Sequence, residues 1–156
     1  MCADALLDEA GTVPPPGDAR LTLGLDVGGT KTALLLLDAA GSVVGMHRIP
    51  TEPECGAAHA MDAAAAEARR EFGVEMDRVD AVGVAVAGQV GSGGVLVGAP
   101  NLGWDGADLR GEAERAFGLP AAILNDVRAA AWAEWRYGAG RGVDDLVVVF
   151  VGTGVG

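Results

Sequence analysis

The chain has 156 residues, half of them hydrophobic, and its 11 Lys and Arg against 22 Asp and Glu give a formal charge of −11. This apolar content argues against disorder, and the scarcity of basic residues argues against binding to a nucleic-acid backbone. No apolar run reaches the roughly 18 residues of a membrane span, and the acidic N-terminus is unlike a signal peptide, so we expect a soluble, cytoplasmic protein of about one domain.

The first predicted elements are three strands joined by short turns. Residues 1–20 contain a run of three prolines and no periodic apolar pattern, which favours a disordered leader. Gly28 and Gly29 follow the first strand and favour the positive φ angles of a tight hairpin turn. The three strands, expected to form an antiparallel meander, occupy residues 21–27, 31–38 and 43–49.

Helices and strands then alternate along the chain. Apolar residues recur at helical spacing over 57–72, with Gly73 as the C-terminal cap, and a buried strand is predicted over 79–88. Asp105 is the predicted N-cap of a helix that ends before Gly118. A strand over 121–126, a helix over 127–138 and a last strand over 146–152 complete the pattern. Alternation of this kind predicts parallel strands in an α/β sheet.

Cysteine and histidine are rare in the chain. The cysteines are Cys2 and Cys55, and no histidine is close enough in sequence to suggest a metal cluster, so we expect two reduced thiols. His47 and His59 lack partners in sequence and are assigned surface or packing roles.

Two motifs offer groups suited to phosphate and hydroxyl chemistry. In LDVGGTKT, residues 25–32, glycines allow a phosphate to reach backbone N–H donors, although an ordinary hairpin turn has the same pattern. In LND, residues 124–126, a strand delivers Asn125 and Asp126 to its carboxyl end, where ligands of open α/β sheets gather. Asp126 can take a hydroxyl proton as a general base or cap the following helix, and the two roles are compatible.

With PNLGW at residues 100–104 and VFVGTGVG at 149–156, these motifs occur in the order and spacing of the ROK family of sugar kinases and repressors. The chain resembles the N-terminal half of a glucokinase of that family. The resemblance implies the α/β actin-like ATPase fold, in which two ribonuclease-H-like lobes enclose a cleft for ATP and sugar. The expected division is a leader over 1–20, an N-terminal lobe with a mixed sheet over 21–140, and the first strand and phosphate loop of an incomplete second lobe over 141–156.

The resemblance also implies the reaction and its residues. ATP with Mg²⁺ would phosphorylate a hexose hydroxyl, with Asp126 as the general base and Asp26 near the magnesium without being its direct ligand. The implied sugar-binding residues are Asn101, Asn125 and Gly88. The residues implied to line the ATP phosphates are Gly28, Gly29, Thr30, Lys31, Gly152, Thr153 and Gly154. Trp104, Trp132 and Trp135 offer stacking surfaces for a sugar, but helical positions favour packing for the last two.

Several alternatives stay open. Glucose, N-acetylglucosamine, N-acetylmannosamine, fructose and allose are all acceptable substrates, and a non-catalytic sugar-binding or regulatory relative, or an inactive truncated lobe, is the alternative function. ROK repressors carry a longer N-terminal helix-turn-helix, which favours the kinase branch. The family's structural zinc cluster and acid-and-histidine sugar motif are expected beyond residue 156. The expected partners are a sugar and ATP, without nucleic acid or membrane, and a homodimer is an open possibility.

Overall fold

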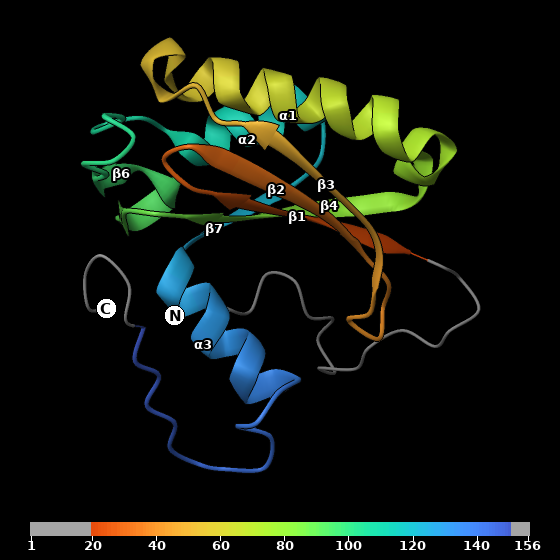
Figure 1. Cartoon of the computed structure of the whole chain (residues 1–156), viewed down its shortest axis with the longest axis vertical. Coiled ribbons are helices and arrows are strands. Elements are labelled where there is room, and N and C mark those ends of the chain that lie inside the picture. Colours follow the sequence, from red (N-terminus) through yellow and green to blue (C-terminus); the bar gives the residue numbers. More distant parts are fainter. Residues whose placement is uncertain (1–19, 151–156) are drawn as a thin grey trace.

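The computed structural model describes residues 20–150. Its centre is a five-stranded mixed sheet with the strand order β3-β2-β1-β4-β7, and a two-stranded β5-β6 ribbon lies beside it (Figure 1). The strands are β1 (Leu21–Val27), β2 (Lys31–Leu37), β3 (Val43–Pro50), β4 (Val79–Val86), β5 (Gln89–Val90), β6 (Leu96–Gly98) and β7 (Ala121–Asn125). The helices are α1 (Gly56–Phe72), α2 (Leu109–Phe117) and α3 (Asp126–Arg136), with short 3₁₀ turns η1 (Pro53–Cys55), η2 (Gly73–Arg78) and η3 (Ser92–Gly94).

The predicted antiparallel meander is confirmed, because β2 pairs antiparallel with both β1 and β3. The expected positive φ angles at Gly28 and Gly29 are wrong, since neither residue is among the positive-φ glycines. The turn is instead closed by the Gly28 N–H group, which donates to the Lys31 carbonyl at 3.1 Å. Gly29 is needed for space, because an added Cβ would lie 3.1 Å from the Asn101 carbonyl oxygen.

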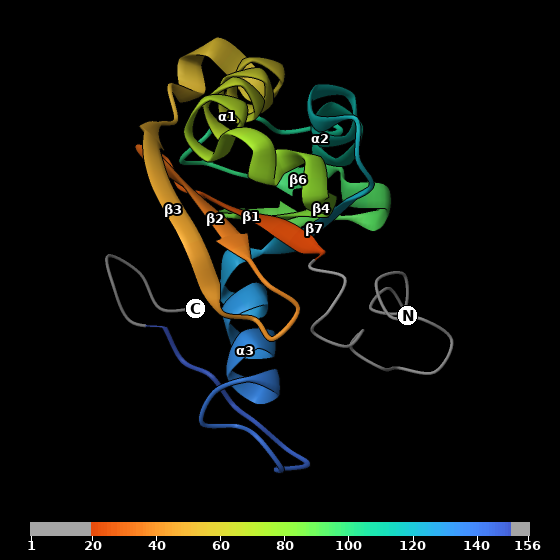
Figure 2. The ribbon, with the colours of Figure 1, turned by 90° about the vertical axis from the view of Figure 1, so that its right-hand side faces the viewer.

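The predicted parallel half is also confirmed. β4 pairs parallel with β1 on one side and with β7 on the other. The connections run through α1 and α2, which both cover the same face of the sheet, while α3 lies on the other side (Figures 1 and 2). The carboxyl ends of β1, β4 and β7 therefore lie at one edge.

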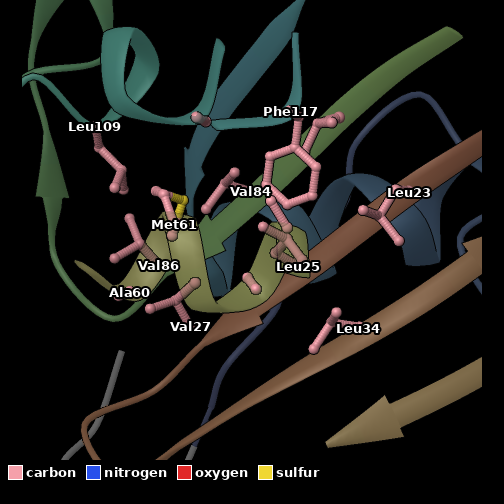
Figure 3. Close-up of a cluster of buried hydrophobic side chains, with 14 of the residues drawn as sticks. Leu23, Leu25, Val27, Leu34, Ala60, Met61, Val84, Val86, Leu109 and Phe117 are labelled. Atoms are coloured by element: carbon pink, nitrogen blue, oxygen red, sulfur yellow. The ribbon is translucent and has the colours of Figure 1, made fainter. Parts of the chain in front are cut away.

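The hydrophobic core lies between the sheet and the pair α1 and α2 (Figure 3). The inward side chains of α1 are mostly alanines, which allow the helix to approach the sheet closely, and the Gly73 N–H group caps its end by donating to the Arg69 carbonyl. The fully buried core residues that Figure 3 labels include Leu23, Val27, Leu34, Met61, Val86 and Leu109.

Helix α3 is packed less tightly than predicted. Of the predicted core or lobe packing of Trp132 and Trp135, the core part is wrong, because the two side chains are 42% and 47% exposed and α3 has no buried residue. The Trp132 ring meets Tyr137 edge-on at a centroid distance of 5.9 Å, and the Trp135 indole N–H donates to the Val143 carbonyl at 3.1 Å. Neither indole belongs to the hydrophobic core between the sheet and the pair α1 and α2.

Two local predictions are wrong. The N-cap of α2 is Asp108, whose Oδ1 accepts from the Gly111 N–H group at 3.0 Å, whereas Asp105 lies outside the helix and accepts from the Ala99 N–H group at 2.7 Å. Residues 146–150 form no strand, because they pair with neither edge strand of the described sheet and a strand requires such a partner.

The ends of the chain limit two other predictions. The last two residues of the expected final strand and most of the expected leader, residues 1–19, lie outside the described residues. Arg20, the last leader residue, forms an ion pair with Asp80 at 2.7 Å. Among residues 20–150, no helix is both long enough and apolar enough to cross a membrane.

The cap of α2 gives a first prediction. Asp108→Ala should lower the free energy of unfolding by about 0.5 to 2 kcal/mol, because the Gly111 N–H group loses its acceptor. Urea unfolding checks the value. Asp108→Asn is the matched control, since it keeps the acceptor oxygen and should change stability by only a few tenths of this amount. Equal losses in the two variants would contradict the assigned cap.

Candidate active site

The parallel register brings three strand ends together. Val27 of β1 is level with Val86 of β4, and Val86 is level with Asn125 of β7. The Ala87 N–H group donates to the Val27 carbonyl at 3.1 Å, so β1 and β4 stay joined beyond their last ladder pair. The residues that follow the three strands therefore lie next to one another, and they include predicted site residues at Gly28, Gly88 and Asp126.

The Gly28–Lys31 turn is held by hydrogen bonds from the buried Thr51, which in turn bonds the buried Thr32. The Thr51 hydroxyl donates to the Gly28 carbonyl at 2.8 Å, and the Thr51 N–H group donates to the Thr30 carbonyl at 3.2 Å. The hydroxyls of Thr32 and Thr51 lie 3.0 Å apart, and both residues are only 2% exposed. Thr51 belongs to no motif, and it lies two residues after the end of the predicted strand over 43–49, where no sequence signal indicated this role.

Two N–H groups of the turn have no partner among residues 20–150. The N–H groups of Gly29 and Thr30 make no hydrogen bond with residues 20–150, whereas that of Gly28 is used by Lys31. Oriented N–H groups in such a turn can bind a phosphate. The side chains of Thr30 and Lys31 are exposed. Among the three turn residues, Gly29 and Thr30 thus fit the predicted phosphate role through their backbone, and Gly28 shapes the turn.

The loop that carries Asn101 packs directly against this turn. An added Cβ at Gly29 would lie 3.3 Å from the Asn101 Cβ, so the two segments touch. The loop is folded on the Ala99 carbonyl, which accepts from the N–H groups of Leu102 and Gly103. The Asn101 side chain is exposed, as a sugar-binding side chain must be.

Trp104 has a structural role in place of the suggested stacking role. Its side chain is only 5% exposed, and its indole N–H donates to the Pro53 carbonyl at 2.8 Å. It is therefore part of the core and ties the Asn101 loop to the 3₁₀ turn before α1.

Asn125 is the residue that organises the start of α3. It is the N-cap, because its Oδ1 accepts from the Arg128 N–H group at 3.1 Å, so the capping role weighed for Asp126 belongs to its neighbour. The Asn125 amide group donates to the Gly88 carbonyl at 3.1 Å and to Asp126 Oδ1 at 2.8 Å. Both amide hydrogens are thus in use, and Asn125 fits a positioning role better than the predicted direct contact with a sugar.

The Asp126 side chain is half-buried, and only its Oδ1 oxygen accepts hydrogen bonds from the described residues. Its Oδ1 also accepts from the Val127 N–H group at 2.9 Å, while its Oδ2 makes no hydrogen bond with the described residues. The carboxylate is fixed in orientation and retains an oxygen that can accept a proton from a bound hydroxyl. Gly88, which accepts from Asn125, has no room for a side chain, because an added Cβ would lie 2.9 Å from the Gly98 carbonyl oxygen.

The site is electrostatically unfavourable as it stands. Asp26 is exposed on its face of β1, yet partial burial of its carboxylate raises its pKa, and the nearby carboxylate of Asp126 raises it further. A divalent cation bound with a phosphate group would offset this repulsion, so the acidic pair fits the expected Mg²⁺ with ATP. The second set of predicted phosphate residues, Gly152, Thr153 and Gly154, lies outside the described residues.

The threonine pair gives a second prediction. Thr51→Val should lower the free energy of unfolding by about 1 to 3 kcal/mol, because the Gly28 carbonyl and the Thr32 hydroxyl lose their partner in a buried site. Thr22→Val, at an exposed position of β1, is the control and should stay within about 0.5 kcal/mol of the wild type. Chemical unfolding of the three proteins decides between them, and a harmless Thr51→Val would refute the anchoring role.

The acidic pair gives a third prediction, about pH. A folded-state pKa above the unfolded value means that the charged form of Asp26 opposes folding, so its cost is present at neutral pH and disappears as the pH falls below the unfolded value near 3.8. Asp26→Asn should therefore be more resistant to urea than the wild type at pH 7, with a gap that closes toward acid pH. Asp77→Asn, on the exposed η2 turn, is the control. A gap that does not change with pH would contradict the raised pKa of Asp26.

Comparison with known proteins connects this geometry to a family. The chain is 36% identical over 137 residues to a glucokinase of Streptomyces coelicolor and 35% identical over 139 residues to an N-acetylmannosamine kinase of Yersinia pestis. These alignments cover 87% and 86% of this chain but 42% and 45% of the relatives. The chain therefore spans less than half the length of these curated sugar kinases.

Solved structures agree with the sequence relatives. The crystal structure of a ROK family glucokinase from Streptomyces griseus in complex with glucose and AMPPNP superposes with a TM-score of 0.76 at 38% identity, covering 87% of this chain and 43% of that one. The expected actin-like ATPase fold is thereby confirmed, with the chain forming one part of it. The ROK family model matches residues 22–156. Because this match takes in most of the sequence, the chain belongs to the ROK family.

Proposed function

We propose that this chain forms the hexose-binding and hydroxyl-activating part of an ATP-dependent sugar kinase. The observation that carries the proposal is the position of Asp126: its free Oδ2 lies at the same sheet edge as the Gly28–Lys31 turn and the Asn101 loop. The names of the relatives, glucokinase and N-acetylmannosamine kinase, support a sugar as the phosphoryl acceptor. They differ in their sugar, so the proposal covers hexoses as a class.

The proposed reaction assigns a separate task to each group. A hexose hydroxyl donates its hydrogen bond to Asp126 Oδ2, and its oxygen attacks the γ-phosphorus of ATP as the bond to the ADP oxygen breaks. The hydroxyl proton passes to Asp126, which acts as the general base. Asn125 is a positioning residue, since its amide holds Asp126 Oδ1 and leaves Oδ2 directed to the substrate.

The phosphate groups are proposed to lie against the turn between β1 and β2. The free N–H groups of Gly29 and Thr30 can donate to phosphate oxygens, with Lys31 nearby on the exposed side. Mg²⁺ bound with ATP would neutralise the negative charge of the phosphates and would lie near Asp26, which would not be one of its direct ligands. The loop with Gly152, Thr153 and Gly154 is proposed to complete the ATP site.

The proposal also sets the protein's partners and location. Its partners are two soluble small molecules, a hexose and ATP. Because ATP is a cytoplasmic reactant, we place the protein in the cytoplasm.

The general-base role gives a fourth prediction. In a version of the protein that includes the second lobe, Asp126→Asn should lower kcat by about 10² to 10⁴, because the amide keeps the shape of the carboxylate but cannot take the proton. Sugar affinity measured by calorimetry should change little. Asp77→Asn is the control for a general loss of charge. Near-normal turnover by Asp126→Asn, measured in a coupled assay for ADP, would rule out Asp126 as the base.

The Asn101 loop gives a fifth prediction. Asn101→Ala should raise the KM for the sugar by the equivalent of about 1 to 3 kcal/mol, because its hydrogen bonds to the hydroxyls form before phosphoryl transfer. The alanine keeps the Cβ and backbone that pack on Gly29, so the turn should not move. Steady-state kinetics with varied sugar test this. A fall in kcat at unchanged KM would assign the loop a different role.

A further inference from the structure

Three potential metal ligands lie together at the start of α1, next to the segment that supports the Gly28–Lys31 turn. They are Glu52, Cys55 and His59, whose donor atoms all lie within 4.8 Å of one another and whose side chains are exposed. The expectation that no histidine is near enough in sequence to form a metal cluster is wrong for this region. His59 follows Cys55 by four residues, about one helical turn, so the two side chains share a face.

We propose that Glu52, Cys55 and His59 form a binding site for a divalent transition-metal ion, with zinc as the best fit. In a tetrahedral zinc site with bonds of about 2.0 to 2.3 Å, neighbouring ligand atoms lie roughly 3.3 to 3.7 Å apart. The Glu52 Oε2 and His59 Nε2 atoms already lie 3.2 Å apart. All three donor atoms are within 4.8 Å, so an adjustment of about 1 Å by exposed side chains completes the set.

The ligand chemistry selects among metals. A thiolate, an imidazole nitrogen and a single carboxylate oxygen suit zinc, whereas Mg²⁺ and Ca²⁺ prefer oxygen ligands. Three protein ligands leave a fourth position for water. The formal charge of −11 also favours a cation over an anion.

The backbone around the three ligands is held by buried contacts. Cys55 is the N-cap of α1 yet has helical dihedral angles, φ −84° and ψ −9°, which set the one-turn spacing to His59. The Trp104 indole donates to the Pro53 carbonyl, between Glu52 and Cys55. Thr51, which precedes Glu52, is buried and anchored to the Gly28–Lys31 turn. A segment ordered before binding loses less conformational freedom when the metal arrives.

Metal binding would be linked to the position of the Asn101 loop. Trp104 belongs to that loop, and its indole donates to the Pro53 carbonyl, between the ligands Glu52 and Cys55. The metal-site proposal does not rest on the proposed kinase function. It is also separate from the cysteine cluster that the family resemblance places beyond residue 156.

The test uses the full chain with Cys2→Ser, which leaves Cys55 as its single thiol. Calorimetric titration with Zn²⁺ should give one ion per chain, and Co²⁺ should produce a thiolate-to-cobalt charge-transfer absorption. Cys55→Ser should abolish this absorption, and His59→Ala and Glu52→Gln should each weaken binding by at least about tenfold. Zn²⁺ should raise the melting temperature of the parent and not that of Cys55→Ser.

His47→Ala is the matched control. His47 lies between two acidic residues of α1, with Glu67 at 3.6 Å and Glu71 at 3.8 Å, but outside the proposed site. Its removal should leave zinc affinity and the cobalt spectrum unchanged. The proposal is overturned if the parent binds no Zn²⁺, if Cys55→Ser and His59→Ala bind as tightly as the parent, or if His47→Ala removes the binding.

Discussion

The parallel pairing of β1, β4 and β7 is the constraint on which the candidate site depends. It sets Val27, Val86 and Asn125 level with one another, so the segments that follow the three strands emerge at one edge of the sheet. Residues about 100 positions apart in sequence thereby become neighbours. A shift of one residue in either pairing would also turn the buried leucines and valines of a strand away from α1 and α2, so core packing and site geometry are fixed by the same register.

Buried polar groups then convert this arrangement into a defined site. The hydroxyls of Thr51 and Thr32 hold the Gly28–Lys31 turn, and the Asn125 amide joins Gly88 to Asp126. Each of these contacts satisfies a backbone or side-chain group inside the protein and fixes the position of a loop or side chain at the site. The cost is electrostatic, because partial burial raises the pKa of Asp26 and the nearby carboxylate of Asp126 raises it further.

The sequence predicted the meander, the alternation of strands and helices and the grouping of the motifs, because apolar periodicity and glycine-marked turns are local signals. It failed where the outcome depended on long-range contacts. Asp105 and Asp108 are both plausible caps, and only the fold shows that Asp105 is used by Ala99. Trp104 is buried because Pro53 lies beside it, and Thr51 was missed because its partner is Gly28, 23 residues away. The described part of the predicted last strand, residues 146–150, pairs with no strand within residues 20–150.

The central claim is that the sheet edge directs Asp126 Oδ2 at the reacting hydroxyl of a hexose. A crystal structure of a version of the protein that includes the proposed second lobe, bound to a hexose and a non-hydrolysable ATP analogue, tests it most directly. The account predicts one sugar hydroxyl oxygen about 2.6 to 3.2 Å from Asp126 Oδ2 and in line with the γ-phosphorus, with Asn125 still bonded to Asp126 Oδ1. A sugar bound with its reacting hydroxyl on another residue, and Asp126 facing only protein or solvent, would contradict it.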